Sequence, residues 1–272
     1  MKSLKNWLLV LSVLSCFGCS SPVHEDGRGC AFVSDSIQYR VEFMSEGCVR
    51  ILSFPEGDTL VTKRLVVDSQ KPAFKDYKWK DTGQQLIFST RELSVAFDKE
   101  DAAFTFQEVS TGKLLLKEKE AKKARHFKRS VTGGEQCLEV TQRFVPTDDE
   151  AIYGLGQYQN GIMNYRGKSV LLLQANMDIV NPFLISTNGY GILWDNYSST
   201  KFEDTEEGYS FTSEVGDASD YYFVYGKNMD EVVAGYRELT GDVPMFGKWV
   251  YGFWQSKERY KSFDELKDVV KE

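Results

Sequence analysis

The sequence predicts a mainly β protein, in which an amino-terminal β-sandwich is followed by the beginning of a second, α/β domain. Three observations support this prediction. Aromatic residues make up 14% of the 272 residues and 22 residues are glycine, a composition that favours strands joined by tight turns. Apolar and polar residues alternate with a period of two along much of the chain. Near residue 229 this period changes to that of a helix, and a short aromatic segment and a second helical pattern follow.

The first 19 residues are expected to form a leader peptide rather than part of the fold. Lys2 and Lys5 precede the apolar run Trp7–Leu14, which is too short to span a bilayer. A cysteine directly after such a run resembles a bacterial lipoprotein signal, in which that cysteine becomes the lipidated first residue. We expect Cys19 to be this residue, with Cys16 as the competing position and an ordinary cleaved signal as the alternative. The mature protein would then be lipid-anchored at the outer membrane or on its periplasmic face.

Residues 20–35 are polar and are expected to form a tether, and residues 36–243 are expected to form the sandwich. Turn sequences such as Glu56-Gly57-Asp58 separate runs in which every second residue should share one face, as in half-buried antiparallel strands. This pattern predicts a β-sandwich. The residues that define these faces are Tyr39, Val41, Phe43, Val49, Ile51, Leu93, Val95, Phe97, Phe104, Phe106, Leu138, Val140, Gln142 and Phe144.

The segment Lys117–Arg129 carries seven basic residues, interrupted by Glu118 and Glu120. One interpretation is a patch that binds nucleic acid or a membrane. We favour a solvated hairpin tip or sheet edge, because lysines commonly protect exposed strand edges from pairing with other chains.

A helix is expected to close the sandwich. After the apolar strand Tyr221–Tyr225, apolar residues recur at helical spacing from Met229 to Leu239, with Asn228 as a plausible N-cap and Gly241 as the stop. The following Val243-Pro244 is expected to mark a domain boundary.

Residues 244–272 are expected to begin a second domain. The aromatic segment Trp249–Trp254 predicts a strand, and Ser262 and Glu265 have the spacing of a capping box at the start of a helix. One strand and one helix make a single βα unit, which needs further units to pack against, so we expect it to open a (β/α)₈ barrel. The sequence stops within the predicted helix, and we therefore expect the chain to be truncated.

Charge and cysteine content exclude several classes of function. The formal net charge is −7, and the leader holds two lysines and no acidic residue, so a nucleic-acid partner is not expected. Beyond the leader, Cys30, Cys48 and Cys137 are odd in number, so at least one is free or pairs outside the chain. His24 and His126 are the two histidines and no CxxC motif occurs, so we expect no metal site, no cofactor and no His-dependent nucleophile.

The stretch Ile152–Ser198 carries the strongest functional signal. Its short apolar runs are joined by turns rich in glycine and asparagine, with amide, tyrosine and tryptophan side chains at the joints. Amides hydrogen-bond hydroxyl groups and flat aromatic rings stack on C–H faces, so this combination suits a sugar. A glycine-rich β-meander whose aromatic side chains fill a core is the alternative interpretation.

The segments Tyr153–Asn196, Pro244–Phe246 and Gly252–Ser256 closely resemble glycoside hydrolase family 31, and within it the α-xylosidases and α-glucosidases of Bacteroides-type gut bacteria. The resemblance implies a galactose-mutarotase-like sandwich before a (β/α)₈ barrel, and a retaining, exo-acting α-glycosidase. Retention requires two carboxyl groups about 5 Å apart. The family holds both aspartates on later barrel strands, which this chain does not contain. We therefore assign no catalytic residue and expect the 272-residue chain itself to be inactive.

The resemblance also implies sugar-binding residues. Asn176-Met177-Asp178 matches the family's Asn-x-Asp, on a sandwich loop that reaches the barrel mouth, so Asp178 and Asn176 are expected to contact sugar hydroxyls. Trp254 and Gln255 end the expected first barrel strand, and Tyr260 follows in the next loop, so these three residues would face the same pocket. The alternatives are a solvated turn for Asp178 and a place in the barrel core for Trp254.

The function expected from this resemblance is an α-xylosidase that trims plant-derived oligosaccharides such as xyloglucan fragments. An α-glucosidase of the same family is the close alternative. A non-catalytic, lipid-anchored glycan-binding protein is the alternative from another class, and the expected βα unit argues against it.

Overall fold

The computed structural model describes residues 23–58, 65–68, 72–119 and 126–271. The predicted leader, with Cys16 and Cys19, lies outside these residues. The chain divides into two compact units, of which the first ends at Gly241 and the second begins at Asp242. Within the described residues, no helix is long and apolar enough to cross a membrane.

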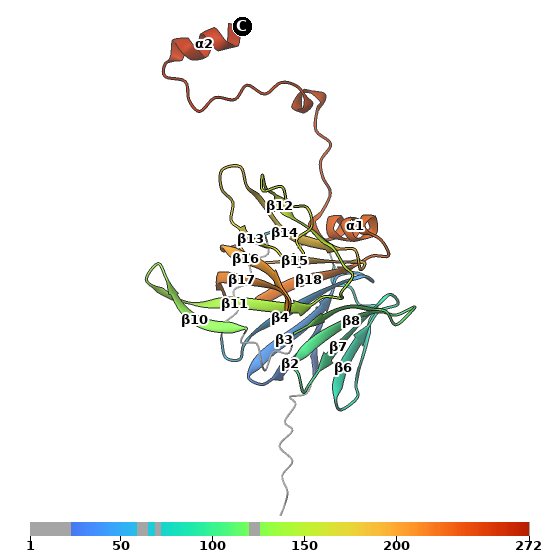
Figure 1. Cartoon of the computed structure of the whole chain (residues 1–272). Coiled ribbons are helices and arrows are strands. Elements are labelled where there is room, and N and C mark those ends of the chain that lie inside the picture. Colours follow the sequence, from blue (N-terminus) through green and yellow to red (C-terminus); the bar gives the residue numbers. More distant parts are fainter. Residues whose placement is uncertain (1–22, 59–64, 69–71, 120–125, 272) are drawn as a thin grey trace, which may run out of the picture. The chain divides into compact units, whose positions relative to one another are not determined.

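The first unit is a two-layered β-sandwich, as predicted (Figure 1). One sheet has the strand order β1-β2-β3-β4-β18-β15-β14-β12. The other has the order β13-β16-β17-β11-β9-β8-β7-β6-β5, and β10 pairs with β11 off this path. The strands are β1 (His24–Glu25), β2 (Cys30–Ser34), β3 (Ile37–Phe43), β4 (Cys48–Pro55), β5 (Lys78–Asp81), β6 (Gln85–Ser89), β7 (Leu93–Asp98), β8 (Ala103–Glu108), β9 (Leu114–Glu118), β10 (Phe127–Thr132), β11 (Glu135–Val145), β12 (Ile152–Gln157), β13 (Ser169–Leu172), β14 (Ile179–Ser186), β15 (Tyr190–Trp194), β16 (Thr200–Thr205), β17 (Gly208–Gly216) and β18 (Ser219–Tyr225).

The core lies between the two sheets and is rich in aromatic side chains. The predicted alternation is confirmed, because the residues at every second position, such as those of β7 and β8, are buried. Phe106 of one sheet stacks on Phe223 of the other, with ring centroids 4.2 Å apart. Trp194 stacks on Phe211 at 5.5 Å, and its indole nitrogen donates to the Ser213 hydroxyl at 2.9 Å. The glycine-rich stretch contributes Tyr165, Tyr190 and Trp194 to this core.

The prediction of a polar tether through residue 35 is wrong. The residues of β2 pair with β3, and β2 buries Cys30 and Phe32 in the core. The short strand β1 pairs with β2 in turn. In β2 the buried residues stand at alternate positions, and pairing with β3 supplies the backbone hydrogen bonds that such a short segment cannot make alone.

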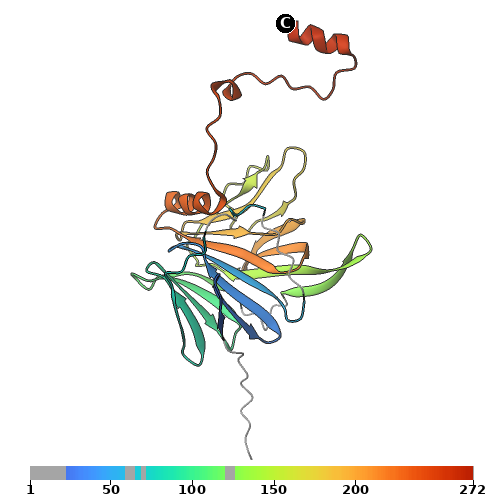
Figure 2. The same cartoon turned by 180° about the vertical axis from the view of Figure 1, so that it is seen from behind.

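Strands that lie far apart in the sequence of the first unit pair in one sheet. β18 pairs with β4 along six residues, and Figure 2 shows the orange strand beside the blue ones. A buried ion pair crosses this contact: the Arg50 Nε donates to Asp220 at 2.7 Å, and the Arg50 Nη1 donates to Glu42 at 3.0 Å. The guanidinium thus lies between two buried carboxylates, on strands that only the fold brings together.

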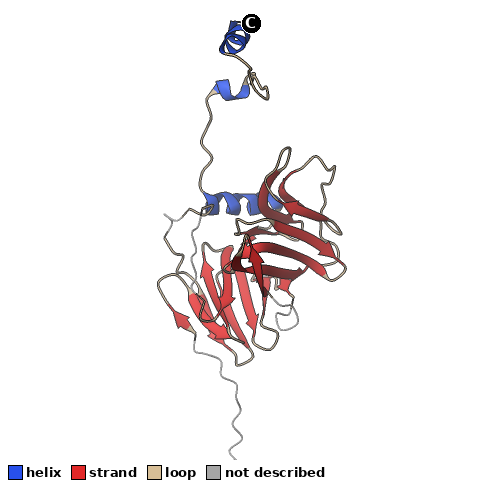
Figure 3. Ribbon diagram, turned by 90° about the vertical axis from the view of Figure 1, so that its left-hand side faces the viewer, coloured by secondary structure: helices blue, strands red, loops and turns tan. Residues whose placement is uncertain are grey.

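The helix α1 (Met229–Thr240) covers the outer face of the eight-stranded sheet (Figure 3). The Asn228 side chain accepts a hydrogen bond from the Glu231 nitrogen at 2.9 Å, which confirms the predicted N-cap. Val232 and Leu239 are buried against the sheet, and Tyr236 stacks on Phe183 with ring centroids 4.2 Å apart.

The second unit contains a 3₁₀ turn, η1 (Lys248–Tyr251), and the helix α2 (Phe263–Lys271). The Ser262 hydroxyl accepts from the Glu265 nitrogen at 3.1 Å, which confirms the predicted cap. The strand predicted at Trp249–Trp254 is not present. A strand needs a neighbour to satisfy its backbone groups, and among the described residues none pairs with this segment.

Candidate functional site

The predicted sugar-binding residues of the first unit lie next to a bulged edge strand, β12. The pairing of β12 with β14 shifts register between Gly154 and Gly156. Gly154, Leu155 and Gly156 all have positive φ, at 99°, 66° and 121°. A Cβ atom on Gly156 would lie 2.0 Å from the Ile179 carbonyl oxygen, so only glycine fits there. Leu155 is buried in this conformation at a cost of about 1–2 kcal/mol, which the surrounding packing must offset.

The loop that follows β12 is held by its own polar side chains. The Tyr158 hydroxyl donates to the Leu155 carbonyl oxygen at 3.0 Å. The Asn164 side-chain oxygen accepts from the backbone nitrogens of Ile152 and Arg166, each at 3.1 Å. The bulge and the loop therefore form one hydrogen-bonded structure.

Arg166 connects this loop to the opposite sheet. Its Nε donates to the Asp204 carboxylate at 2.9 Å, and its Nη1 donates to the Thr147 carbonyl oxygen at 3.2 Å. The Gly167 nitrogen donates to the same Asp204 oxygen at 2.6 Å. These contacts leave the loop little freedom, which is what a binding surface built on loops requires.

The matched Asn-x-Asp lies in a tight turn between β13 and β14. Ala175 and Asp178 form an isolated bridge, and Met177 between them has φ of 69°. The Gln174 side chain closes the turn, because its nitrogen donates to the Asp178 carbonyl oxygen at 2.8 Å and its oxygen accepts from the Val180 nitrogen at 3.2 Å. The backbone of the turn is thus fixed by an amide that the sequence analysis left without a role.

The side chains of Asn176 and Asp178 are available for a ligand. Asn176 is exposed, Asp178 is half-buried, and neither side chain makes a hydrogen bond or ion pair with a described residue. The pKa of Tyr158 is raised to about 12, chiefly by burial and to a lesser extent by Tyr165 and Asp178, so the Asp178 carboxylate lies near this ring. A carboxylate and an amide beside a tyrosine can accept and donate hydrogen bonds to sugar hydroxyls. The sugar-binding role of both residues stays a prediction.

Large apolar side chains are exposed along the same stretch of chain. A soluble surface normally carries such residues singly, and several close together in the chain indicate a contact surface. The exposed residues between β12 and β14 are Met163, Leu171, Leu173, Met177 and Ile179.

The other predicted sugar-binding residues belong to the second unit. Trp254 is 63% exposed, so it is not buried in a core here, and its Nε1 donates to the Val250 carbonyl oxygen at 2.7 Å. Gln255 is exposed. Tyr260 is half-buried, with the Lys257 Nζ 5.2 Å from the centre of its ring. Their roles also stay predictions.

A buried polar network was not predicted. The Glu118 carboxylate accepts from Gln142 Nε2 at 2.8 Å, from the Tyr221 hydroxyl at 2.7 Å and from the Phe104 nitrogen at 2.8 Å. Burial raises the pKa of Glu118 to about 7, although the hydrogen bonds from Tyr221 and Phe104 oppose this shift. The prediction of a solvated edge for Lys117–Arg129 is therefore wrong at Glu118, which is 4% exposed; residues 120–125 lie outside the described residues. The charge run masked the alternation that places Glu118 inward.

This network does not form a catalytic pair. A pKa near 7 suits an acid or base, but Glu118 lies in the core and its oxygens are occupied by internal donors. Burial also raises the pKa of Glu150, whose oxygens accept from Ser186 and from the Thr147 nitrogen. In the part of the chain that the structure describes, no group of His, Cys, Asp and Glu is arranged to hold a metal ion.

Comparison with known sequences identifies the family. Residues 38–203 match the profile of the glycosyl hydrolase 31 N-terminal galactose mutarotase-like domain. The chain belongs to glycoside hydrolase family 31. Its sandwich is therefore the galactose-mutarotase-like domain of this family, as the resemblance implied.

Two relatives in family 31 are each about three times as long as this chain. The chain is 37% identical over 252 residues to an α-xylosidase of Saccharolobus solfataricus. This match covers 87% of the chain and 33% of that protein. It is 27% identical over 259 residues to α-glucosidase 2 of Bacillus thermoamyloliquefaciens. That match covers 88% of the chain and 31% of that protein. The chain thus spans about a third of the length of these two curated relatives.

Solved structures of family 31 share the fold. The α-xylosidase of Xanthomonas citri superposes with a TM-score of 0.77 at 23% identity, covering 92% of this chain and 43% of that one. The dextranase of Flavobacterium johnsoniae, solved with isomaltotriose, has a TM-score of 0.73 at 22% identity, covering 93% of this chain and 32% of that one.

Proposed function

We propose that this chain is the amino-terminal part of a retaining, exo-acting α-xylosidase that removes xylose from plant-derived oligosaccharides such as xyloglucan fragments. The observation that carries the proposal is the 37% identity to an α-xylosidase along 87% of the chain. Family membership supports the hydrolysis of a glycosidic bond, and the choice of xylose rests on this relative.

The described site supports a substrate-binding rather than a catalytic contribution. Asp178 and Asn176 have free polar side chains on a turn whose backbone is fixed, so they can meet a sugar without rearrangement. We propose that Asp178 accepts hydrogen bonds from sugar hydroxyls. The two aspartates that a retaining mechanism needs are proposed to lie in a (β/α)₈ barrel that follows residue 272 in the whole protein.

The exposed apolar side chains between β12 and β14 support a covering domain. We propose that a further domain of the whole protein covers these side chains. We also propose that Trp254, Gln255 and Tyr260 bind sugar in the whole protein.

An α-glucosidase is the second candidate, favoured by the similarity to α-glucosidase 2 along 88% of the chain. A lipid-anchored glycan-binding protein without activity is the candidate from another class. Lipidation at Cys19 and attachment to the outer membrane or its periplasmic face remain part of the proposal.

The deciding experiment extends the reading frame past the codon for Glu272 and assays the purified product on aryl α-xyloside and aryl α-glucoside. Turnover that favours the xyloside supports the proposal, and turnover that favours the glucoside supports the second candidate. In the extended enzyme, Asp178→Asn should lower kcat/KM at least about 100-fold with an unchanged Tm. The matched control is Asp149→Asn, an exposed aspartate of the loop before β12. A folded extended product that turns over neither substrate would refute the proposal that the whole protein is an α-xylosidase or α-glucosidase.

A further inference from the structure

A second cleft lies in the sandwich, away from the Asn176–Asp178 turn. It consists of two adjoining cavities of about 590 and 350 Å³, which share Arg129 and Leu138 in their walls. The walls come from the turn before β3 and the β3–β4 hairpin, from the turn before β8, from β10 and β11, and from the turn between β17 and β18. No lining residue belongs to β12, β13, β14 or the loops between them. Both volumes fall in the range of about 300–1,000 Å³ that small-molecule sites occupy.

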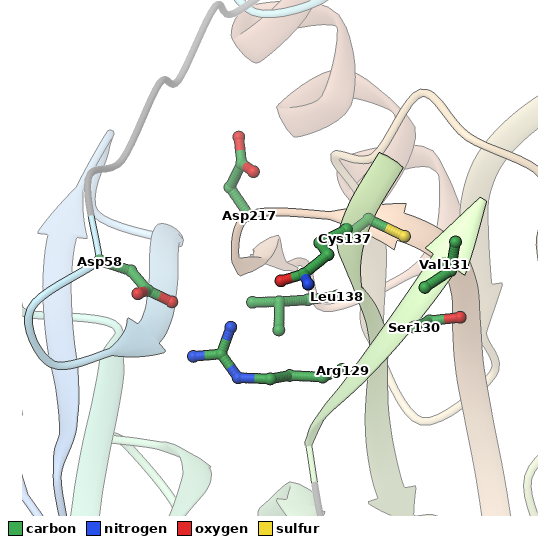
Figure 4. A pocket seen from close by; sticks show the side chains of 8 residues that line it. Asp58, Arg129, Ser130, Val131, Cys137, Leu138 and Asp217 are labelled. Carbon is green, nitrogen blue, oxygen red and sulfur yellow. The ribbon is translucent and has the colours of Figure 1, made fainter. Parts of the chain in front are cut away.

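The larger cavity is lined by three charged side chains, Arg129, Asp58 and Asp217. The Arg129 guanidinium points into the space between Asp58 and Asp217, whereas the sulfur of Cys137 points away (Figure 4). None of Arg129, Asp58 and Asp217 makes a side-chain hydrogen bond or ion pair with another described residue. The larger cavity therefore offers guanidinium donors and carboxylate acceptors at the same time.

The smaller cavity contains a buried hydrogen-bond acceptor, His126. Its Nδ1 lies 3.1 Å from the side-chain oxygen of Gln142, whose nitrogen donates to Glu118. The oxygen of Gln142 can only accept, so the proton of the imidazole is on Nδ1 and Nε2 carries a lone pair. Burial lowers the pKa of His126 to about 4, which keeps the ring neutral at pH 7. Nε2 is buried and has no hydrogen-bond partner among the described residues, and it exposes almost no surface to the cavity.

The rest of the smaller cavity is largely apolar, with Tyr39, Phe127 and Leu138 in its walls. The cleft thus combines ring and aliphatic surfaces with donors and acceptors. A pyranose ring has the matching features, since its hydroxyls donate and accept and its C–H faces are apolar. The larger cavity is lined by two carboxylates and one guanidinium, a balance of charge that disfavours a polyanion.

We propose that this cleft is an accessory site for a neutral sugar, in which Arg129, Asp58 and Asp217 bind hydroxyl groups and the apolar wall of the smaller cavity packs on a C–H face of the ring. The site would hold an oligosaccharide on the sandwich independently of the Asn176–Asp178 turn. This inference goes beyond the proposed function, because binding here requires no catalytic domain.

The test is isothermal titration of the 272-residue chain with maltotriose, isomaltotriose and an α-xylosylated cello-oligosaccharide. Saturable binding of at least one sugar is expected. Arg129→Ala should weaken this binding at least about tenfold, because it removes charge-assisted hydrogen bonds. Lys128→Ala is the matched control: it removes the same charge from the next residue of β10, which does not line the cleft.

Further variants distinguish sugar binding in this cleft from sugar binding at the Asn176–Asp178 turn. Asp217→Ala should also weaken binding, and Asp149→Ala, at an exposed position outside both proposed sites, should leave it unchanged. The inference is overturned if none of the three sugars binds saturably, or if Arg129→Ala binds like the wild type. Binding that is lost in Asp178→Ala and kept in Arg129→Ala would also overturn it and would assign the sugar to the turn. An inactive extended enzyme would refute the proposed function and leave this result standing.

Discussion

The side-chain nitrogen of Gln142 donates a hydrogen bond to the Glu118 carboxylate across 2.8 Å, inside the core between the two sheets. The same Gln142 accepts through its oxygen from Ser219 at 2.9 Å and faces His126 at 3.1 Å. Two buried titratable groups are therefore linked through one amide. Their pKa values are displaced in opposite directions, to about 7 for Glu118 and to about 4 for His126.

Glu118 should make the free energy of unfolding fall as pH rises. Burial raises its pKa from 4.5 to about 7, so between these values the folded state binds the proton more tightly than the unfolded state. The stability that protonation supplies is lost as pH rises through this window, by about 3 kcal/mol in total. In Glu118→Gln the unfolding free energy, relative to wild type, should rise by this amount from about pH 4.5 to about pH 7.5 in urea titrations. Glu135→Gln, at an exposed position of β11, should give a parallel curve. Parallel curves for both variants would contradict the assignment.

His126 should act in the opposite sense. Burial lowers its pKa from 6.5 to about 4, so the unfolded state takes up the proton first as pH falls. The wild type should lose about 2–3 kcal/mol from this group between about pH 6.5 and pH 4, and His126→Gln should lose less over the same range. The measurement is the same urea titration. An unchanged acid dependence in the variant would mean that the imidazole is not held neutral by burial.

The bulge in β12 should tolerate no side chain at Gly156. Gly156→Ala places a Cβ atom 2.0 Å from the Ile179 carbonyl oxygen at φ of 121°, so we expect a loss of at least about 3 kcal/mol. Gly161→Ala is the control, because its φ of 69° is also positive but no atom lies within 4 Å of the added Cβ. It should cost about 1 kcal/mol. Equal losses in urea unfolding would mean that φ, and not the close approach of β14, requires glycine here.

The Arg50 guanidinium should be essential for stability. Arg50→Met leaves the carboxylates of Glu42 and Asp220 buried without this partner, so we expect a loss of about 3–5 kcal/mol. Arg91→Met removes a surface ion pair with Glu46 and should produce no measurable change. A stable Arg50→Met variant in thermal unfolding would show that the two acids are protonated or rehydrated in the fold.

The 272-residue chain should not hydrolyse aryl α-xylosides or aryl α-glucosides. The carboxylates of the buried acids Glu118 and Glu150 accept hydrogen bonds from internal donors. A retaining mechanism needs two carboxyl groups that can reach the substrate, and we propose that these lie in another domain. The assay uses independently purified preparations of the chain, with a complete family 31 enzyme as the positive control. Reproducible turnover by the chain would contradict the proposal that catalysis belongs to a following domain.

The sequence by itself determined the class of the fold, the family and the local elements. Alternation placed the inward residues of strands such as β7 and β8, and a single Asn at residue 228 located the start of α1. These signals are local, because the side-chain period and the cap depend on neighbours within a few residues. The family motif identified the Asn176–Asp178 turn in the same way.

The tertiary structure decided what depends on distant partners. Whether residues 30–34 form a strand depended on β3, and the predicted strand at Trp249–Trp254 did not form without a pairing partner in the described chain. The inward place of Glu118 was concealed in a run of lysines and became visible only once Tyr221 and Gln142 surrounded it. Burial and pairing are long-range properties, since they arise where segments such as β4 and β18 meet. The cleft around Arg129 also depends on distant segments, because its walls come from four separate parts of the chain.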